Sequence, residues 1–197
     1  MAKALKSAHG APGQVPDREK LRQLVLYVAS RSQDDPRFGR VKLNKLIYYA
    51  DFANFRRTGR SITGSAYIRM PFGPCAEDFH KLEEEMSQRD ELKIQRHQYY
   101  GHIQERPIAL VVPDLSRFSG EEIAVVEEVI SEHWERNATE TSLDSHLFVG
   151  WDLASEKEQI PYGVARLHSE RELTAFHYDL ARDTAKRLAV RDQADAP

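Results

Sequence analysis

One segment of the chain, from Val41 to Arg57, is apolar over most of the circumference of the helix that it predicts. Its apolar side chains fall on two faces at helical spacing, with only a narrow polar stripe between them. A helix of this kind is packed from several sides, because no broad face is left for water. We therefore expect a central core helix. One face carries Leu43, Leu46, Ile47 and Ala50, the other carries Tyr48, Phe52 and Phe55, and the stripe consists of Asn44, Asp51 and Asn54.

Capping signals predict where several helices begin and end. Asp17 is a suitable N-cap, and Gly59 suits the left-handed position that follows the core helix. Ser119 and Glu122 have the spacing of a capping box, in which each residue satisfies a backbone N–H of the other. The helices expected besides the core helix run from Asp17 to about residue 32, from Pro74 onward, and over about 119–134, 141–149 and 169–190.

A proline-rich corner follows the core helix. Ser65–Met70 alternates as a short extended segment, and Pro71-Phe72-Gly73-Pro74 comes directly after it. Proline fixes φ and lacks an N–H, so this sequence predicts a rigid corner. We expect Pro74 to be the first residue of the next helix, since that position needs no N–H donor. The inner face of that helix would carry Cys75, Phe79, Leu82 and Met86.

Two further strands are predicted at 92–98 and 104–112, with Ile108, Leu110 and Val112 on one face of the second. The fold class expected from these elements is α+β and predominantly helical. It is a compact bundle around the central helix (about 41–57) with a small antiparallel β-hairpin (about 92–112). We expect a flexible leader at 1–16, a single domain at 17–190 and a frayed tail at 191–197.

Composition narrows the class of protein. The net charge of -3 disfavours a chain-wide electrostatic grip on nucleic acid. Cys75 is the single cysteine, so an internal disulfide or a cysteine-built zinc site is excluded. There is no apolar run of the ~20 residues that a membrane span needs and no signal-peptide pattern. We therefore expect a cytoplasmic protein without a membrane association.

Three segments in order resemble one family. They are Lys42-Leu-Asn-Lys-Leu-Ile-Tyr-Tyr-Ala-Asp-Phe, then Tyr67-Ile-Arg-Met-Pro-Phe-Gly-Pro leading to Phe79, and then Ser145-His146 with Gly150-Trp151 and Ile160-Pro161-Tyr162. Their order and spacing resemble the Panacea domain, the SocA-like antitoxin family, which is phage-associated. The likeness covers roughly residues 18–180. The family-motif and scaffold residues are Leu43, Leu46, Tyr48, Tyr49, Phe52, Tyr67, Pro71, Gly73, Pro74, Phe79, Ser145, His146, Trp151, Pro161 and Tyr162.

The resemblance implies an antitoxin of a toxin–antitoxin or phage-defence module, which neutralises a cognate protein toxin by direct contact. It also implies that the toxin is encoded by the adjacent gene. One branch of the family acts as an adaptor that delivers its toxin to the protease ClpXP, and this stays open as an alternative. The family accepts very diverse toxins, so the resemblance does not name this one. Homo-oligomerisation also stays open.

Catalytic and metal-binding patterns are absent from the sequence. The eight histidines form no H-x-x-x-H pair, and there is no phosphate-binding or nucleophile-elbow motif. Ser145 and His146 are adjacent on a helix and face different directions, so they do not make a nucleophile–base pair. Asp51 lies on a mostly apolar helix, where we expect it to anchor Arg69 or a backbone amide rather than to catalyse. We therefore expect no enzyme, no cofactor and no metal.

A DNA-binding autorepressor is the alternative from another class. Helices at about 119–136 and 141–149 have the outline of a helix-turn-helix unit, but the second has no Arg or Lys to touch phosphates or guanine. Arg56, Arg57 and Arg60 form a basic cluster that can instead complement a helix dipole. DNA binding is thus the less favoured hypothesis. The candidate partner-binding residues are Tyr99, Tyr100, His102, Phe72, Arg56, Arg57 and Arg60.

Overall fold

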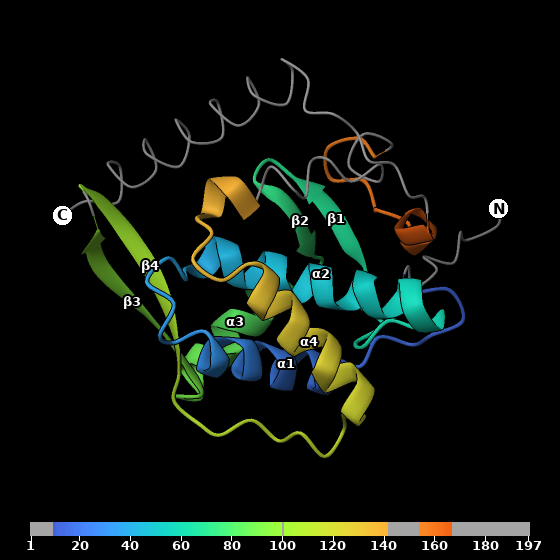
Figure 1. The fold of residues 1–197 in the computed structure, drawn as a ribbon, viewed down its shortest axis with the longest axis horizontal. Helices are drawn as coiled ribbons and strands as arrows, with labels where there is room; N and C mark the ends of the chain where they lie inside the picture. Colours follow the sequence, from blue (N-terminus) through green and yellow to red (C-terminus); the bar gives the residue numbers. More distant parts are fainter. Residues whose placement is uncertain (1–9, 100, 142–153, 167–197) are drawn as a thin grey trace, which may run out of the picture.

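The computed structural model describes residues 10–99, 101–141 and 154–166. Arg40–Thr58 (α2) is the central helix of the molecule, as predicted. Eleven of its residues are buried, and they come from every side of the helix. It contacts α1 (Arg18–Arg31), α4 (Gly120–Glu132), the strand Gly73–Ala76 (β2) and the 3-10 helix Tyr162–Arg166 (η1). Figure 1 shows α2 crossing the middle of the fold, with a strand pair on one side and α1 and α4 on the other.

The predicted caps of α1, α2 and α4 are confirmed. The Asp17 side chain accepts from the Lys20 N–H at 2.9 Å, at the start of α1. Gly59 ends α2 in the left-handed conformation, with φ of 78°. Ser119 and Glu122 form the expected capping box, with N–H to side-chain oxygen distances of 2.8 and 3.1 Å.

The proline corner is a β-hairpin rather than the start of a helix. Tyr67–Met70 (β1) pairs antiparallel with Gly73–Ala76 (β2), and Pro71 and Phe72 form the turn. The prediction that Pro74 begins a helix is wrong, because Pro74 lies in β2 opposite Arg69. A strand at the edge of a sheet tolerates a proline for the same reason as a helix start, namely that no partner needs its N–H.

The next helix, Phe79–Gln88 (α3), therefore begins five residues later than predicted, after the N-cap residue Asp78. Its buried face carries Phe79, Leu82 and Met86, as expected. Cys75 lies in β2 instead, where it is buried. The inner face was thus predicted correctly for the three residues that the helix includes.

The second hairpin was predicted correctly. Leu92–Tyr99 (β3) pairs antiparallel with His102–Ala109 (β4), from Leu92 opposite Ala109 to Tyr99 opposite His102. The predicted second strand extended to Val112, but the paired strand β4 ends at Ala109, and one further hydrogen bond joins the two segments there, from the Leu110 N–H to the Glu91 carbonyl at 2.8 Å. Leu110 and Val112 are accordingly exposed. In Figure 1 this hairpin projects from the helical body on the left.

The segment before α1 contacts the loop after α2. The Ala11 N–H donates to the Gly64 carbonyl at 3.3 Å, and the Gln14 side-chain amide donates to the Ser61 carbonyl at 2.9 Å. A Cβ at Gly10 would lie 2.1 Å from the Gly64 oxygen, so only glycine fits there. Residues 1–9 of the expected leader lie outside the described residues.

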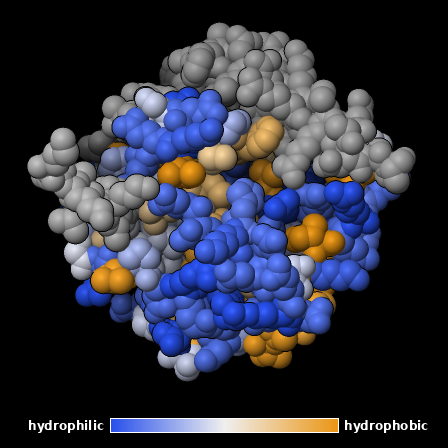
Figure 2. All heavy atoms as spheres, turned by 180° about the vertical axis from the view of Figure 1, so that it is seen from behind, coloured by the Kyte–Doolittle hydropathy of each residue, from blue (hydrophilic) through white to orange (hydrophobic). Residues whose placement is uncertain are grey.

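The fold class is confirmed as α+β and predominantly helical, with two small antiparallel strand pairs. The predicted helix at 169–190 lies outside the described residues, as does the one at 141–149 apart from Thr141, which belongs to a described helical stretch at 138–141. None of the described helices is long and apolar enough to cross a membrane. Figure 2 shows the opposite face of the molecule as mostly hydrophilic, with separate hydrophobic patches.

Candidate functional site

A pocket of about 280 Å³ lies between α2 and the β1–β2 turn. Its rim is accessible, since His80 is exposed and Pro71 and Phe72 are half-buried, whereas its floor is formed by buried residues of α2, β2 and α3. We call it the turn pocket. It contains four of the predicted motif and partner residues, Pro71, Phe72, Gly73 and Phe79, and its other lining residues are Arg40, Val41, Asn44, Lys45, Met70, Cys75 and His80.

Lys45 is the chemically unusual residue of the turn pocket. Its side chain is 1% exposed, and its ammonium donates to the carbonyl oxygen of Phe72. No carboxylate of the described residues pairs with it, in contrast to Lys42, whose ammonium lies 2.5 Å from the buried Asp35 carboxylate. Burial accordingly lowers the pKa of Lys45 to about 7.

Two further groups complete the polar part of the pocket. The side-chain amide of Asn44 donates to the Pro74 carbonyl at 2.8 Å, while its Oδ1 is buried and accepts no hydrogen bond from a described residue. The Cys75 thiol is also buried, which raises its pKa to about 11. A thiol with this pKa is protonated at neutral pH and is a poor nucleophile.

The charge of Arg40 at the pocket rim is already balanced. Its guanidinium forms an ion pair with the buried Glu83 carboxylate and approaches Glu105 at 3.5 Å. Desolvation opposes the charge of Arg40, but the hydrogen bond and the charge of Glu83 raise its pKa overall. Lys45 is therefore the pocket cation that lacks a carboxylate among the described residues.

The Asp51 carboxylate joins three segments inside the core. It accepts from the Thr63 N–H at 2.8 Å, from the Tyr67 hydroxyl at 2.7 Å and from the Tyr162 hydroxyl at 3.4 Å, and the Thr63 hydroxyl also donates to it. The expected backbone-amide anchor is thus present. The alternative, Arg69, is wrong because its guanidinium donates to the Ala154 carbonyl at 2.6 Å.

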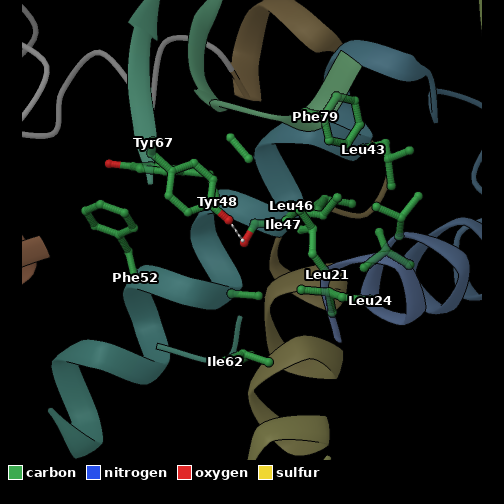
Figure 3. Close-up of a cluster of buried hydrophobic side chains, with 14 of the residues drawn as sticks. Leu21, Leu24, Leu43, Leu46, Ile47, Tyr48, Phe52, Ile62, Tyr67 and Phe79 are labelled. Atoms are coloured by element: carbon green, nitrogen blue, oxygen red, sulfur yellow. Dashed lines mark hydrogen bonds between the residues drawn. The ribbon is translucent and has the colours of Figure 1, made fainter. Parts of the chain in front are cut away.

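Burial determines what Asp51 does. The side chain is 0% exposed, and desolvation raises its pKa against the lowering effect of its hydrogen bonds. Burial also raises the pKa of Tyr48, Tyr67 and Tyr162. A carboxylate without access to solvent makes no contact with a substrate, so the role of this cluster is to connect α2, β1 and η1 inside the core. Figure 3 shows a part of the buried hydrophobic core in which Tyr48, Phe52 and Tyr67 lie close together.

A second hollow, of about 420 Å³, lies between α2 and α4. Tyr49 stacks on His133 across it, with 4.6 Å between ring centroids, and the Tyr49 hydroxyl donates to the Thr141 carbonyl at 2.8 Å. Arg56 lies at its edge. These contacts give Tyr49 a packing role in addition to its place in the family motif.

The predicted basic cluster does not form a uniform positive surface. Arg57 pairs with Glu128 of α4 at 2.6 Å, and Arg60 lines a hollow that also contains Glu121 and Glu122. Arg56, Arg57 and Arg60 are all exposed, but acidic residues of α4 lie near Arg57 and Arg60. This arrangement disfavours the phosphate contacts that DNA binding requires.

The remaining motif and partner residues lie in the core, at the surface, in the β3–β4 hairpin or outside the described residues. Leu43, Leu46, Tyr48, Phe52 and Tyr162 are buried in the core. Pro161 is exposed. Tyr99 and His102 end β3 and begin β4. Tyr100, Ser145, His146 and Trp151 lie outside the described residues.

Lys45 was not among the site residues predicted from the sequence. A signal was present, because a helix that is apolar all round has no exposed face on which a lysine could lie. No group of His, Cys, Asp and Glu side chains suited to hold a metal occurs in the part of the chain that the structure describes.

The model of the antitoxin SocA-like, Panacea domain family matches residues 43–152. The chain belongs to this family. The match begins inside α2 and includes both hairpins, α3 and α4, so most of the turn pocket lies within the Panacea domain. Neither the curated proteins nor the solved structures contain a match to the chain.

Proposed function

We propose that the protein is an antitoxin that neutralises a cognate protein toxin by binding to it directly. The observation that carries this proposal is the membership in the SocA-like, Panacea domain family. The toxin would be the product of the adjacent gene. The role requires a stable binding surface and no chemical step, and the core around Asp51 provides a rigid support for one.

We further propose that the β3–β4 hairpin contributes to this surface. It projects from the body (Figure 1), and Gln95, Arg96, His97 and Gln98 of β3 are exposed. Arg96 approaches the Glu105 carboxylate across the hairpin at 3.5 Å. Arginine on a strand that is held at its base suits a protein contact, because its planar donors can bind a partner without a large ordering cost.

The arrangement of charges favours a protein partner over DNA. The arginines of the predicted basic cluster lie beside glutamates of α4, which would repel a phosphate backbone. A gel-shift experiment on the promoter of the operon at several salt concentrations separates the two. The autorepressor alternative predicts a specific shift that weakens steeply with salt, whereas the antitoxin proposal needs none.

Co-expression with the adjacent gene product tests the main proposal. We expect that product to stop growth when expressed alone, and growth to return when the antitoxin is co-expressed and co-purifies with it. A product that is harmless alone and does not co-purify would refute the proposal. Deleting the antitoxin and measuring the half-life of the toxin tests the ClpXP adaptor alternative, which predicts slower turnover.

The hairpin is tested separately with Arg96→Glu. We expect this variant to lose the rescue of growth or the co-purification with the toxin. The control variant Glu156→Lys, at an exposed position between α4 and η1, should retain both. Equal rescue of growth by the two variants would show that the hairpin is not part of the interface. It would not contradict the antitoxin role itself.

A further inference from the structure

Two polar groups of the turn pocket have hydrogen-bonding capacity that the described residues do not use. The ammonium of Lys45 has three N–H donors, and the Phe72 carbonyl is its one acceptor among the described residues. The Oδ1 of Asn44 accepts no hydrogen bond there. Both residues belong to the wall of the same pocket. The pocket therefore offers a cation with spare donors and a separate spare acceptor.

A buried amine without a carboxylate is costly to the fold. Lys42, one helical turn earlier, shows the ordinary solution, with Asp35 beside its ammonium and a second bond to the Arg136 carbonyl. Lys45 has no such partner in the described part of the chain, and the nearby Glu83 is engaged by Arg40. Groups that reduce stability in this way are concentrated at binding sites, where a ligand supplies the missing partner.

The rest of the pocket is apolar and small. Met70, Phe72 and Phe79 provide the apolar wall. The volume of about 280 Å³ lies just below the ~300–1,000 Å³ of drug-sized ligand sites, so it suits one amino-acid residue rather than a large molecule. A ligand complementary to this pocket combines a carboxylate, an N–H donor and a short apolar group.

We propose that the turn pocket binds the C-terminal residue of a polypeptide, with an apolar side chain. The terminal carboxylate accepts from the Lys45 ammonium, the backbone N–H of the same residue donates to the Asn44 Oδ1, and its side chain packs on Phe72 and Phe79. The rest of the polypeptide chain extends out of the pocket past the exposed His80. This inference does not depend on the proposed antitoxin role.

Charge is the reason why the pocket should prefer the C-terminal residue of a polypeptide over a free amino acid. A free amino acid carries an ammonium next to its carboxylate, and that ammonium would have to enter a pocket that already holds a cation. In a polypeptide the same nitrogen is an uncharged amide N–H, which matches the acceptor of Asn44. Capture of a C-terminal carboxylate by a preformed site is an established mode of peptide recognition.

The test uses the full-length protein and the pentapeptide acetyl-Ala-Ala-Ala-Ala-Leu, with either a free carboxylate or a C-terminal amide. We expect the free acid to bind and the amide to bind at least about tenfold more weakly, because a charge-assisted hydrogen bond is lost. Lys45→Met should abolish that difference. The matched control Lys93→Met, at an exposed lysine of β3, should preserve it.

Asn44→Ala is a second variant. It should weaken the binding of the free-acid peptide and of the amide peptide by the same factor. Equal affinity of the two peptides for the wild type, or preference for the acid retained in Lys45→Met, would overturn the proposal. Acetyl-leucine that binds when the pentapeptide does not would also overturn it, since the occupant would then be a small molecule.

Discussion

Replacing Lys45 with methionine should make the protein more stable at neutral and acidic pH. Methionine has a similar shape and carries no charge, so it removes the buried ammonium without leaving a cavity. Burial lowers the pKa of Lys45 from 10.5 to about 7. At about 1.4 kcal/mol per pH unit, the charged amine in the core costs about 5 kcal/mol relative to water.

The pH dependence follows from the direction of this pKa change. Below pH 7 the amine is charged in both states, and the folded state bears the full cost. Between pH 7 and 10.5 the unfolded chain holds a proton that the folded chain has lost, so wild-type stability rises relative to the variant. Above 10.5 the amine is neutral in both states and the cost is absent. The advantage of Lys45→Met should therefore shrink by about 2 kcal/mol between pH 7 and 9, since the folded-state amine is still half protonated at pH 7.

Urea unfolding of both proteins at pH 6, 7, 8 and 9 measures this difference. Lys42→Met is the matched control, because it removes an equally buried lysine from the same helix. Its loss leaves the Asp35 carboxylate buried and unpaired, so we expect destabilisation by about 3–5 kcal/mol. A Lys45→Met protein that is less stable than wild type at pH 6, or a difference that does not change with pH, would refute the reasoning.

Three further predictions concern the fold. Asp51→Ala leaves the buried Thr63 N–H without its acceptor and removes the 2.7 Å acceptor of the Tyr67 hydroxyl, so the free energy of unfolding should fall by more than about 3 kcal/mol in a denaturant titration, and a loss below about 1 kcal/mol would contradict the cluster. Ser119→Ala removes the capping box of α4 and should cost about 1 kcal/mol by the same assay, whereas Ser87→Ala at the C-terminal end of α3 should cost less. Because burial raises the pKa of Cys75 to about 11, the native thiol should react with a disulfide reagent at pH 8 far more slowly than the urea-unfolded thiol, and equal rates would show that Cys75 is accessible.

Local signals in the sequence predicted most of the described fold. The central helix, the capping box at Ser119 and the hairpin from Leu92 depend on spacing within one element, so they can be read without knowing the tertiary structure. Pro74 was misassigned because the first turn of a helix and an edge strand both accept a residue without an N–H. The choice depends on pairing with Tyr67–Met70, which is a tertiary fact.

The candidate site was less predictable. The partners of Asp51 include Tyr162, which lies 111 residues away, and no local pattern connects the two. The burial of Lys42 and Lys45 could be inferred from a helix that is apolar all round. Which of them meets Asp35 depends on the loop that leads into α2, and the sequence pattern does not specify the path of that loop.

The β1–β2 hairpin has one more consequence, which concerns how a partner can attach. The outer edge of β1 is already occupied by the segment 157–160, through hydrogen bonds of Arg69 with Lys157 and Glu158 and of Tyr67 with Ile160. On β2, Pro74 has no N–H and its carbonyl accepts from Asn44. Within the described residues this small sheet therefore offers no vacant edge for an added strand. Whatever binds beside it has to be recognised by side chains and shape rather than by backbone pairing.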